Sequence, residues 1–187
     1  MGNKFLIIKS QELFLRKTLF FSKNLSSFDV NNIYLNLIYL IDMKIEYNNL
    51  YTHFVFSTSG RQFMIPEKNR IRIEKYVTGI VNNNLSKLYA IYANPEHVHL
   101  LVSRSATLSE EELATIIADS SESFINKNKL ASGKFSWQQS ASAFSVSKSD
   151  IDKVCKYILN QSDHHRKVSF AEEYDQFLKY YEEKLKE

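Results

Sequence analysis

Two kinds of apolar spacing alternate along this chain, and their order constrains the fold more than any other feature. The strand-like segments, which are apolar, aromatic or β-branched, are residues 50–58, 87–93, 98–104 and 134–147. Apolar residues recur at helical spacing over residues 67–84 and again in a helix after Thr107. The order is strand, helix, strand, strand, helix, strand. Right-handed crossovers turn that order into a ferredoxin-like (RRM-like) antiparallel sheet, an α+β fold with two helices on one face.

Polar residues mark where the helices begin. Thr107 with Glu110 has the spacing of a capping box for the second helix, and Ser169 with Glu172 has it for the last one. Between them, Ser147 or Ser149 is expected to cap a helix that runs to about Ser162. The sheet is therefore followed by C-terminal helices.

Composition places the chain among single-domain proteins. It has 187 residues, of which 44% are hydrophobic, and its formal net charge is +3, which allows a nucleic-acid partner without indicating one. One cysteine, Cys155, excludes an internal disulfide and favours a cytoplasmic location. The most apolar stretch, residues 33–41, is about half as long as a membrane-spanning helix, so no membrane association is expected.

The first 42 residues differ in pattern from the rest. They are rich in Asn, Phe, Leu and Ser and lack clear turn signals, whereas ordered patterning begins at Met43. We expect residues 1–42 to be an N-terminal extension outside a core domain of residues 43–187. The alternative is an ordinary N-terminal helix that packs on the domain.

A pair of histidines in the third strand segment is the strongest chemical feature. His97 and His99 stand two residues apart in Pro95-Glu96-His97-Val98-His99-Leu100-Leu101-Val102. In a strand, residues i and i+2 point to the same face, so both imidazoles project side by side. Such a pair is suited to binding a metal ion, although two half-exposed strand histidines without a metal are the plainer alternative.

A second feature lies in the third helix. Tyr157 and Gln161 are four residues apart and are expected on one helix face. The sequence contains eleven tyrosines, so this pair taken alone favours core packing or a surface position over a functional role.

Together these segments resemble the single-tyrosine HUH transposases of small insertion sequences, a family that includes the REP-associated tyrosine transposases. The matching segments are Tyr51-Thr52-His53-Phe54-Val55-Phe56, Pro95 to Val102, Phe135-Ser136-Trp137-Gln138, Ala143-Phe144-Ser145-Val146-Ser147, and Tyr157-Ile158-Leu159-Asn160-Gln161 followed by His164-His165. Their order and spacing also match. Many relatives carry glycines after the tryptophan segment, where this chain has Ser140-Ala141-Ser142, so we expect this loop to differ in form.

The resemblance implies a role for each matching residue. His97 and His99 would bind a metal ion with Gln161 as the third ligand, and Tyr157 would be the catalytic nucleophile. The metal would act as a Lewis acid on the scissile phosphate of single-stranded DNA. A tyrosine pKa is ordinarily about 10, and a nearby cation favours the phenolate. Attack would leave a 5′-phosphotyrosine and a free 3′-hydroxyl, which can later reverse the reaction on another strand.

The resemblance also implies a cofactor and partners. The metal in this family is magnesium or manganese (Mg2+ or Mn2+), although imidazole is a softer ligand than magnesium prefers. The partners would be single-stranded DNA with hairpin ends and a second copy of the chain, in a homodimer that could share its active sites. Residues expected to contact DNA phosphates are Arg61, Lys148, Lys153, Lys156, Arg166 and Lys167. The alternative for these residues is a solvated helix face, since Asp150, Asp152 and Asp163 lie among them.

Two other functions stay open at this point. One is a catalytically inactive single-stranded nucleic-acid-binding module on the same fold, which the altered loop favours. The other is a zinc hydrolase built on His97 and His99. It would need a further ligand and a general base. Glu96, the adjacent acidic residue, is expected to point to the opposite face of the sheet.

Overall fold

The structure, a computed structural model, describes residues 48–184 and contains the predicted sheet. Its four strands are β1 (Tyr51–Ser57), β2 (Lys87–Ala93), β3 (His97–Ser103) and β4 (Ser142–Val146). They pair antiparallel in the order β2-β3-β1-β4. The two central strands, β1 and β3, are each flanked on both sides, and every residue of β1 is buried. The predicted α+β, ferredoxin-like fold is confirmed.

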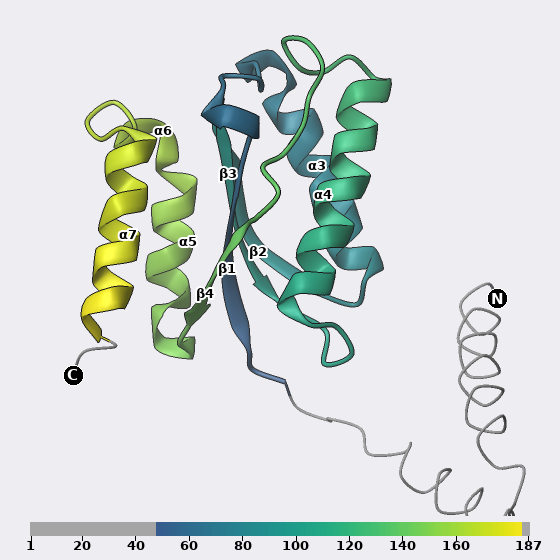
Figure 1. The fold of residues 1–187 in the computed structure, drawn as a ribbon. Coiled ribbons are helices and arrows are strands. Elements are labelled where there is room, and N and C mark those ends of the chain that lie inside the picture. The colour runs from purple at the N-terminus through teal and green to yellow at the C-terminus, as the bar shows by residue number, and fades with distance from the viewer. Residues whose placement is uncertain (1–47, 185–187) are drawn as a thin grey trace, which may run out of the picture. The chain divides into compact units, whose positions relative to one another are not determined.

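Helices cover both faces of this sheet (Figure 1). They are α3 (Glu67–Asn83), α4 (Glu110–Lys127), α5 (Ile151–Leu159), α6 (Gln161–His164) and α7 (Phe170–Lys184), with short 3-10 helices η1 (Ser59–Arg61) and η2 (Lys148–Asp150). Figure 1 shows α3 and α4 on one face, and α5 and α7 on the other. The two helices expected from the crossovers are α3 and α4, while the C-terminal helices form a third layer.

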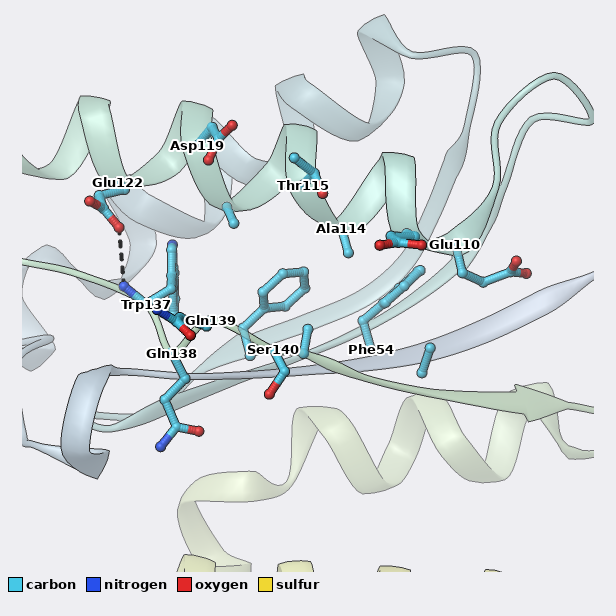
Figure 2. A pocket seen from close by; sticks show the side chains of 15 residues that line it. Phe54, Glu110, Ala114, Thr115, Asp119, Glu122, Trp137, Gln138, Gln139 and Ser140 are labelled. Carbon is cyan, nitrogen blue, oxygen red and sulfur yellow. Dashed lines mark hydrogen bonds between the residues drawn. The ribbon is translucent and has the colours of Figure 1, made fainter.

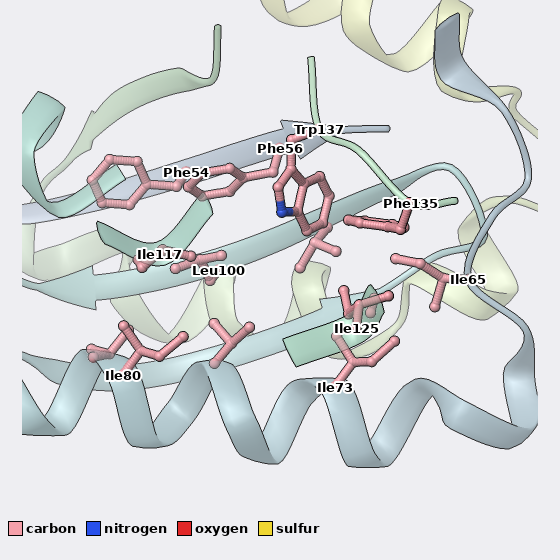
Figure 3. Close-up of a cluster of buried hydrophobic side chains, with 14 of the residues drawn as sticks. Phe54, Phe56, Ile65, Ile73, Ile80, Leu100, Ile117, Ile125, Phe135 and Trp137 are labelled. Carbon is pink, nitrogen blue, oxygen red and sulfur yellow. The ribbon is translucent and has the colours of Figure 1, made fainter. Parts of the chain in front are cut away.

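The larger hydrophobic core lies between the sheet and α3 and α4 (Figure 3). Alternate residues of the central strands, such as Phe54, Phe56 and Leu100, face this side because successive strand residues point to opposite faces. They pack against Ile73 of α3 and Ile117 of α4, both almost fully buried. This core uses the apolar stripes that the sequence places on both helices.

The other strand residues face α5 through a smaller apolar cluster. Tyr51, Ala90, Leu101 and Ile158 form its buried part. The remainder of this side is polar, because buried His53, His97 and His99 share the same strand face. The sheet therefore has one apolar face that stabilises the fold and one face that is suited to chemistry.

The start of α4 differs from the predicted one. The capping box of α4 is made by Ser109 and Glu112, not by Thr107 and Glu110. Glu110 instead accepts a hydrogen bond of 2.6 Å from Arg104 Nε, which ties the preceding loop back to the end of β3. The capping box predicted for Ser169 and Glu172 is present.

The third predicted helix is interrupted at Asn160. It starts at Ile151, after η2, and Asp150 precedes it without a side-chain cap, so neither Ser147 nor Ser149 caps it. Asn160 leaves helical backbone geometry at φ −94° and ψ 14°, and α6 then begins at Gln161. The break separates Tyr157 and Gln161 into two helices.

The prediction for the N-terminal extension, residues 1–42, lies outside the described residues. Within residues 48–184, no helix combines the length and apolar composition needed to cross a membrane.

Candidate metal and nucleophile site

Strand register brings three histidines together on the face of the sheet that α5 and α7 cover. His97 and His99 belong to β3, and His53 belongs to the paired strand β1. His53 Nε2 lies 2.9 Å from His99 Nδ1, and the ring centroids of His97 and His99 are 4.8 Å apart. The predicted side-by-side placement of His97 and His99 is confirmed, and both side chains have no exposed surface.

Burial keeps these histidines neutral. It lowers the pKa of His53 to about 3 and that of His97 to about 4, and it also lowers the pKa of His99. A neutral imidazole keeps a lone pair on one ring nitrogen, which is the form that binds a metal ion. The low pKa values therefore suit a group of metal ligands better than a group of positive charges.

Glu173, on α7, lies at the centre of this group, and the sequence did not single it out. Its Oε2 atom is 3.4 Å from His99 Nε2 and 3.7 Å from His97 Nε2. Its side chain is only 3% exposed. Burial by itself raises the pKa of Glu173, but hydrogen-bond donors around it, first His99 and then Tyr157 and Gln161, lower the pKa well below its usual range. Glu173 is therefore a buried carboxylate anion.

Tyr157 reaches the same carboxylate from α5. Its hydroxyl donates a short hydrogen bond to Glu173 Oε1, and its ring centroid is 5.9 Å from that of His99. Burial, and then the charge of Glu173, raise the pKa of Tyr157 well above its ordinary value. The phenol is thus protonated at neutral pH, with a proton acceptor already in contact.

Gln161 is fully buried beside Tyr157 even though a helix break separates them. Its Nε2 donates to Glu173 Oε1 at 2.9 Å, and its Oε1 accepts from Asn94 Nδ2 at 3.1 Å. The structure thus brings together Tyr157, Gln161, His97 and His99, as the sequence predicts, with Glu173 as their shared neighbour.

A group that could hold a metal ion is present among the described residues: His97, His99, His165 and Glu173. One donor atom from each lies within 4.8 Å of all the others. His165 follows α6, and the sequence analysis includes it only in the His164-His165 pair that follows the matching Tyr157 to Gln161 segment. The sequence could not predict its place in the site, because local spacing does not show that a histidine in a loop lies beside a strand.

Glu96 does not point away from this region as expected. Its Oε1 lies 3.6 Å from His97 Nδ1. Glu96 belongs to the turn before β3, so the alternation of strand side chains does not apply to it.

A groove of about 750 Å³ opens beside the nucleophile candidate. His53, Lys153, Tyr157, Glu173 and Phe177 are among the residues that line it. It gives the buried site a solvent-accessible side between β4, α5 and α7.

The basic residues predicted to contact DNA are all exposed, and they come from three parts of the chain. Lys148, Lys153 and Lys156 lie on η2 and α5, while Arg166 and Lys167 follow α6. Arg166 also pairs with Asp163, at 3.3 Å. Arg61 lies on η1, with its guanidinium 5.4 Å from the centre of the Phe170 ring and 5.2 Å from that of Tyr174.

A second pocket, of about 620 Å³, lies on the α4 side of the sheet (Figure 2). It is lined by the loop that departs from the family pattern, including Gln139 and Ser140. Its acidic lining residues are Glu110, Glu111, Asp119 and Glu122. Carboxylates repel phosphates, so this pocket does not have the charge of a DNA-binding site.

Comparisons with known proteins agree with the resemblance seen in the sequence. The family model described as "Transposase IS200 like" matches residues 46–161, which is more than half of the chain. The fold and the histidine–tyrosine site thus occur within a transposase domain. The chain belongs to the IS200-like transposase family.

Two solved structures are similar in fold. One is described as a "putative transposase" from Deinococcus radiodurans R1, with 18% sequence identity and a TM-score of 0.49, covering 65% of this chain and 98% of that chain. The other is a REP-associated tyrosine transposase bound to a REP hairpin, with 13% identity and a TM-score of 0.48, covering 67% of this chain and 74% of that chain. A search of curated proteins gives no match.

Proposed function

We propose that this protein is a transposase that cleaves and rejoins single-stranded DNA through a covalent tyrosine intermediate. The observation that carries the proposal is the placement of Tyr157 on a buried carboxylate that also adjoins His97 and His99. A nucleophile, a proton acceptor and metal-binding histidines are thus held together in a transposase-family domain.

The residues present fit a divalent cation, which we propose is Mg2+ or Mn2+. His99 Nε2 and Glu173 Oε2 are buried and 3.4 Å apart, and neither has a partner at good hydrogen-bond geometry within the described residues. A buried carboxylate among imidazoles that burial keeps neutral attracts a cation. When bound, such a cation supplies Lewis-acid stabilisation of the charge that develops on the scissile phosphate. His97 and His99 would hold it, and Gln161 belongs to the same cluster.

The protein's own groups account for the proton and the nucleophile. The Tyr157 oxygen forms a bond to phosphorus, the bond from phosphorus to the 3′ oxygen breaks, and that oxygen leaves as a hydroxyl after taking a proton from water. The phenol proton passes to Glu173 Oε1, which already accepts its hydrogen bond. In the reverse reaction a 3′-hydroxyl attacks the phosphotyrosine and Tyr157 recovers its proton.

Single-stranded DNA would reach Tyr157 through the groove that Lys153 lines. The exposed basic residues Lys148, Lys153 and Lys156, with Arg166 and Lys167, border the α5 and α6 side of the site, and Arg61 lies near the start of α7. We propose that they contact phosphates, and that the protein is a homodimer.

An adduct assay tests this function. Full-length protein incubated with manganese and single-stranded DNA from the flanks of its own gene should give a complex that survives boiling in detergent. Tyr157→Phe should abolish the complex, because the variant loses only the nucleophilic oxygen. Tyr180→Phe is the matched control, since Tyr180 lines the same groove but is 55% exposed. An adduct that persists in Tyr157→Phe would assign the nucleophile to another residue.

The second candidate function is a nucleic-acid-binding module without catalysis. The sequence feature that favours it is the altered loop at Ser140, where many relatives carry glycines; the acidic pocket that this loop lines adds no support. In that case the protein would bind single-stranded DNA and form no adduct with manganese present.

A further inference from the structure

Two helix faces line the groove that opens beside the nucleophile candidate. The face on η2 and α5 consists of Asp150, Lys153, Val154 and Tyr157, and the face on α7 consists of Glu173, Gln176, Phe177 and Tyr180. Both sets follow the spacing i, i+3, i+4 and i+7, which gathers side chains on one side of a helix. Figure 1 shows α5 and α7 side by side over the same face of the sheet. The groove is therefore a channel between two helices.

The reacting groups lie at the inner end of this channel. Tyr157 donates its hydrogen bond to the buried Glu173 there. Tyr180 is seven residues, or about 10.5 Å, further along α7, and it is 55% exposed. The groove thus leads from the nucleophile to solvent past Tyr180. A DNA strand with its scissile phosphate at Tyr157 would have its neighbouring nucleotides within reach of Tyr180.

Aromatic rings continue from the nucleophile along α7. The ring centroid of Phe177 lies 5.9 Å from that of Tyr157, and 5.3 Å from that of Phe144 on β4, with which it stacks. Phe177 is half-buried in this cluster, whereas Tyr180, less than one turn further on, is exposed. Every nucleobase has a π face, so an exposed aromatic ring can bind an unpaired base by stacking whatever its sequence.

The charges along the groove suit a nucleic-acid strand. Lys153 is exposed and supplies a positive charge on the α5 side. The two carboxylates that line the groove accept hydrogen bonds from neighbouring hydroxyls: Asp150 Oδ2 from Ser147 at 2.6 Å, and Glu173 Oε1 from Tyr157. A basic side chain for the phosphate, with an aromatic ring for the base, is the combination that proteins use to bind single strands.

We propose that this groove binds the nucleotides next to the scissile phosphate, with one unpaired base stacked on Tyr180 and the adjoining phosphate against Lys153. This inference rests on the proposed function and adds a DNA-recognition residue to it. Stacking uses the aromatic ring of Tyr180 and does not need its hydroxyl. Tyr180 therefore holds the strand in place and takes no part in the chemistry at Tyr157.

Binding of single-stranded DNA from the flanks of the gene gives the first test. Every protein in this test carries Tyr157→Phe, so the strand is not cleaved, and circular dichroism checks folding. Tyr180→Ala should weaken binding about 5–100-fold, whereas Tyr180→Phe keeps the ring and should bind as tightly as Tyr180 does. Leu178→Ala is the control, because Leu178 is exposed on α7 but does not line the groove. Equal weakening by Leu178→Ala, or none by Tyr180→Ala, would reject the proposal.

A scan with abasic sites locates the stacked base. Removing the base at one position of the strand should weaken binding to the Tyr180→Phe protein by about the same factor. The Tyr180→Ala protein should show no further loss at that position, because the ring and the base are the two halves of one contact. Losses that add to the effect of Tyr180→Ala at every position would overturn the proposed contact.

These results are separable from the adduct assay. With Tyr157 intact, Tyr180→Ala should lower the adduct yield at limiting DNA and recover it at saturating DNA, because the ring binds the strand and does not react. An adduct, combined with unchanged DNA binding by Tyr180→Ala, would support the strand-transfer function and reject the stacking site. Coupling in the abasic scan without any adduct would support the stacking site on a binding module and reject the strand-transfer function.

Discussion

At the scale of single residues, Ser121 shows how one hydroxyl supports the main core. It is fully buried in α4, and its Oγ accepts a hydrogen bond of 3.0 Å from Trp137 Nε1. Ser121→Ala would leave the indole N–H without a partner in a buried position, so we expect a loss of about 1–3 kcal/mol in the free energy of unfolding. Urea denaturation measures this loss. Ser123→Ala, an exposed position on the same helix, should change the stability little; equal effects at both positions would show that the hydrogen bond is unimportant.

The same scale shows what the sequence can reveal of the site. His97 and His99 could be predicted because their spacing within one strand sets their direction. Tyr157 and Gln161 were found through the family resemblance. Glu173 and His165 were missed because their role depends on how α6 and α7 fold back over the sheet, and no local pattern separates Glu173 from its neighbour Glu172. Contacts contributed by distant segments become visible only once the topology is known.

At the scale of elements, α3 and α4 end in the same way, and neither uses glycine. After α3, Leu85 has φ +54°; its N–H bonds to Asn82 O, and the next N–H, of Ser86, bonds to Val81 O, both at 3.2 Å. This is a Schellman motif, in which glycine is usual at the left-handed position. Lys129 occupies the equivalent position after α4, with φ +52°.

Replacing Leu85 by glycine should therefore stabilise the protein. Leu85 is 81% exposed, so little packing is lost. The left-handed conformation costs a non-glycine residue about 1–2 kcal/mol, and the greater freedom of glycine in the unfolded chain offsets part of the gain. We expect Leu85→Gly to raise the free energy of unfolding by about 0.5–1 kcal/mol in urea denaturation. Leu85→Ala keeps the strain and should give no such gain, and an equal gain from both would point to removal of the exposed leucine instead.

Element types were more predictable than element ends. β2 has the predicted bounds, Lys87–Ala93, because its apolar run is flanked by clear turn residues. The predicted end of α5 was wrong because the helix breaks at Asn160, where the sequence has neither glycine nor proline to signal a break. The predicted start of α4 was wrong because the sequence contains two overlapping capping-box patterns. Glu110 forms an ion pair with Arg104, and Ser109 and Glu112 form the cap. Tertiary contacts therefore help to set where these helices begin and end.

At the scale of the whole molecule, positive charge is expected to act mainly through the α5 side. The net charge is only +3, so DNA affinity should depend on a few local contacts. For single-stranded DNA, each phosphate contact adds about 0.7 to the slope of log K against log salt concentration. The double variant Lys153→Ala and Lys156→Ala should lower this slope by about 1.4 and weaken binding. Lys68→Ala with Lys75→Ala, on α3 across the sheet, removes the same charge and should leave the slope unchanged; equal changes would indicate a diffuse charge effect.

The last prediction concerns whether one chain supplies every residue of its active site. His97, His99 and Tyr157 meet within a single chain, so no second subunit is needed to bring them together. Light scattering should give a homodimer of twice the 21.9 kDa chain mass. After verified subunit exchange, a mixture of the His97→Ala, His99→Ala variant with Tyr157→Phe should form no DNA adduct, because every site lacks either its histidines or its tyrosine. Recovered adduct would mean that Tyr157 acts in the neighbouring subunit, through a movement of α5 and α7. The mass of a single chain would contradict the dimer but would leave the arrangement of the site intact.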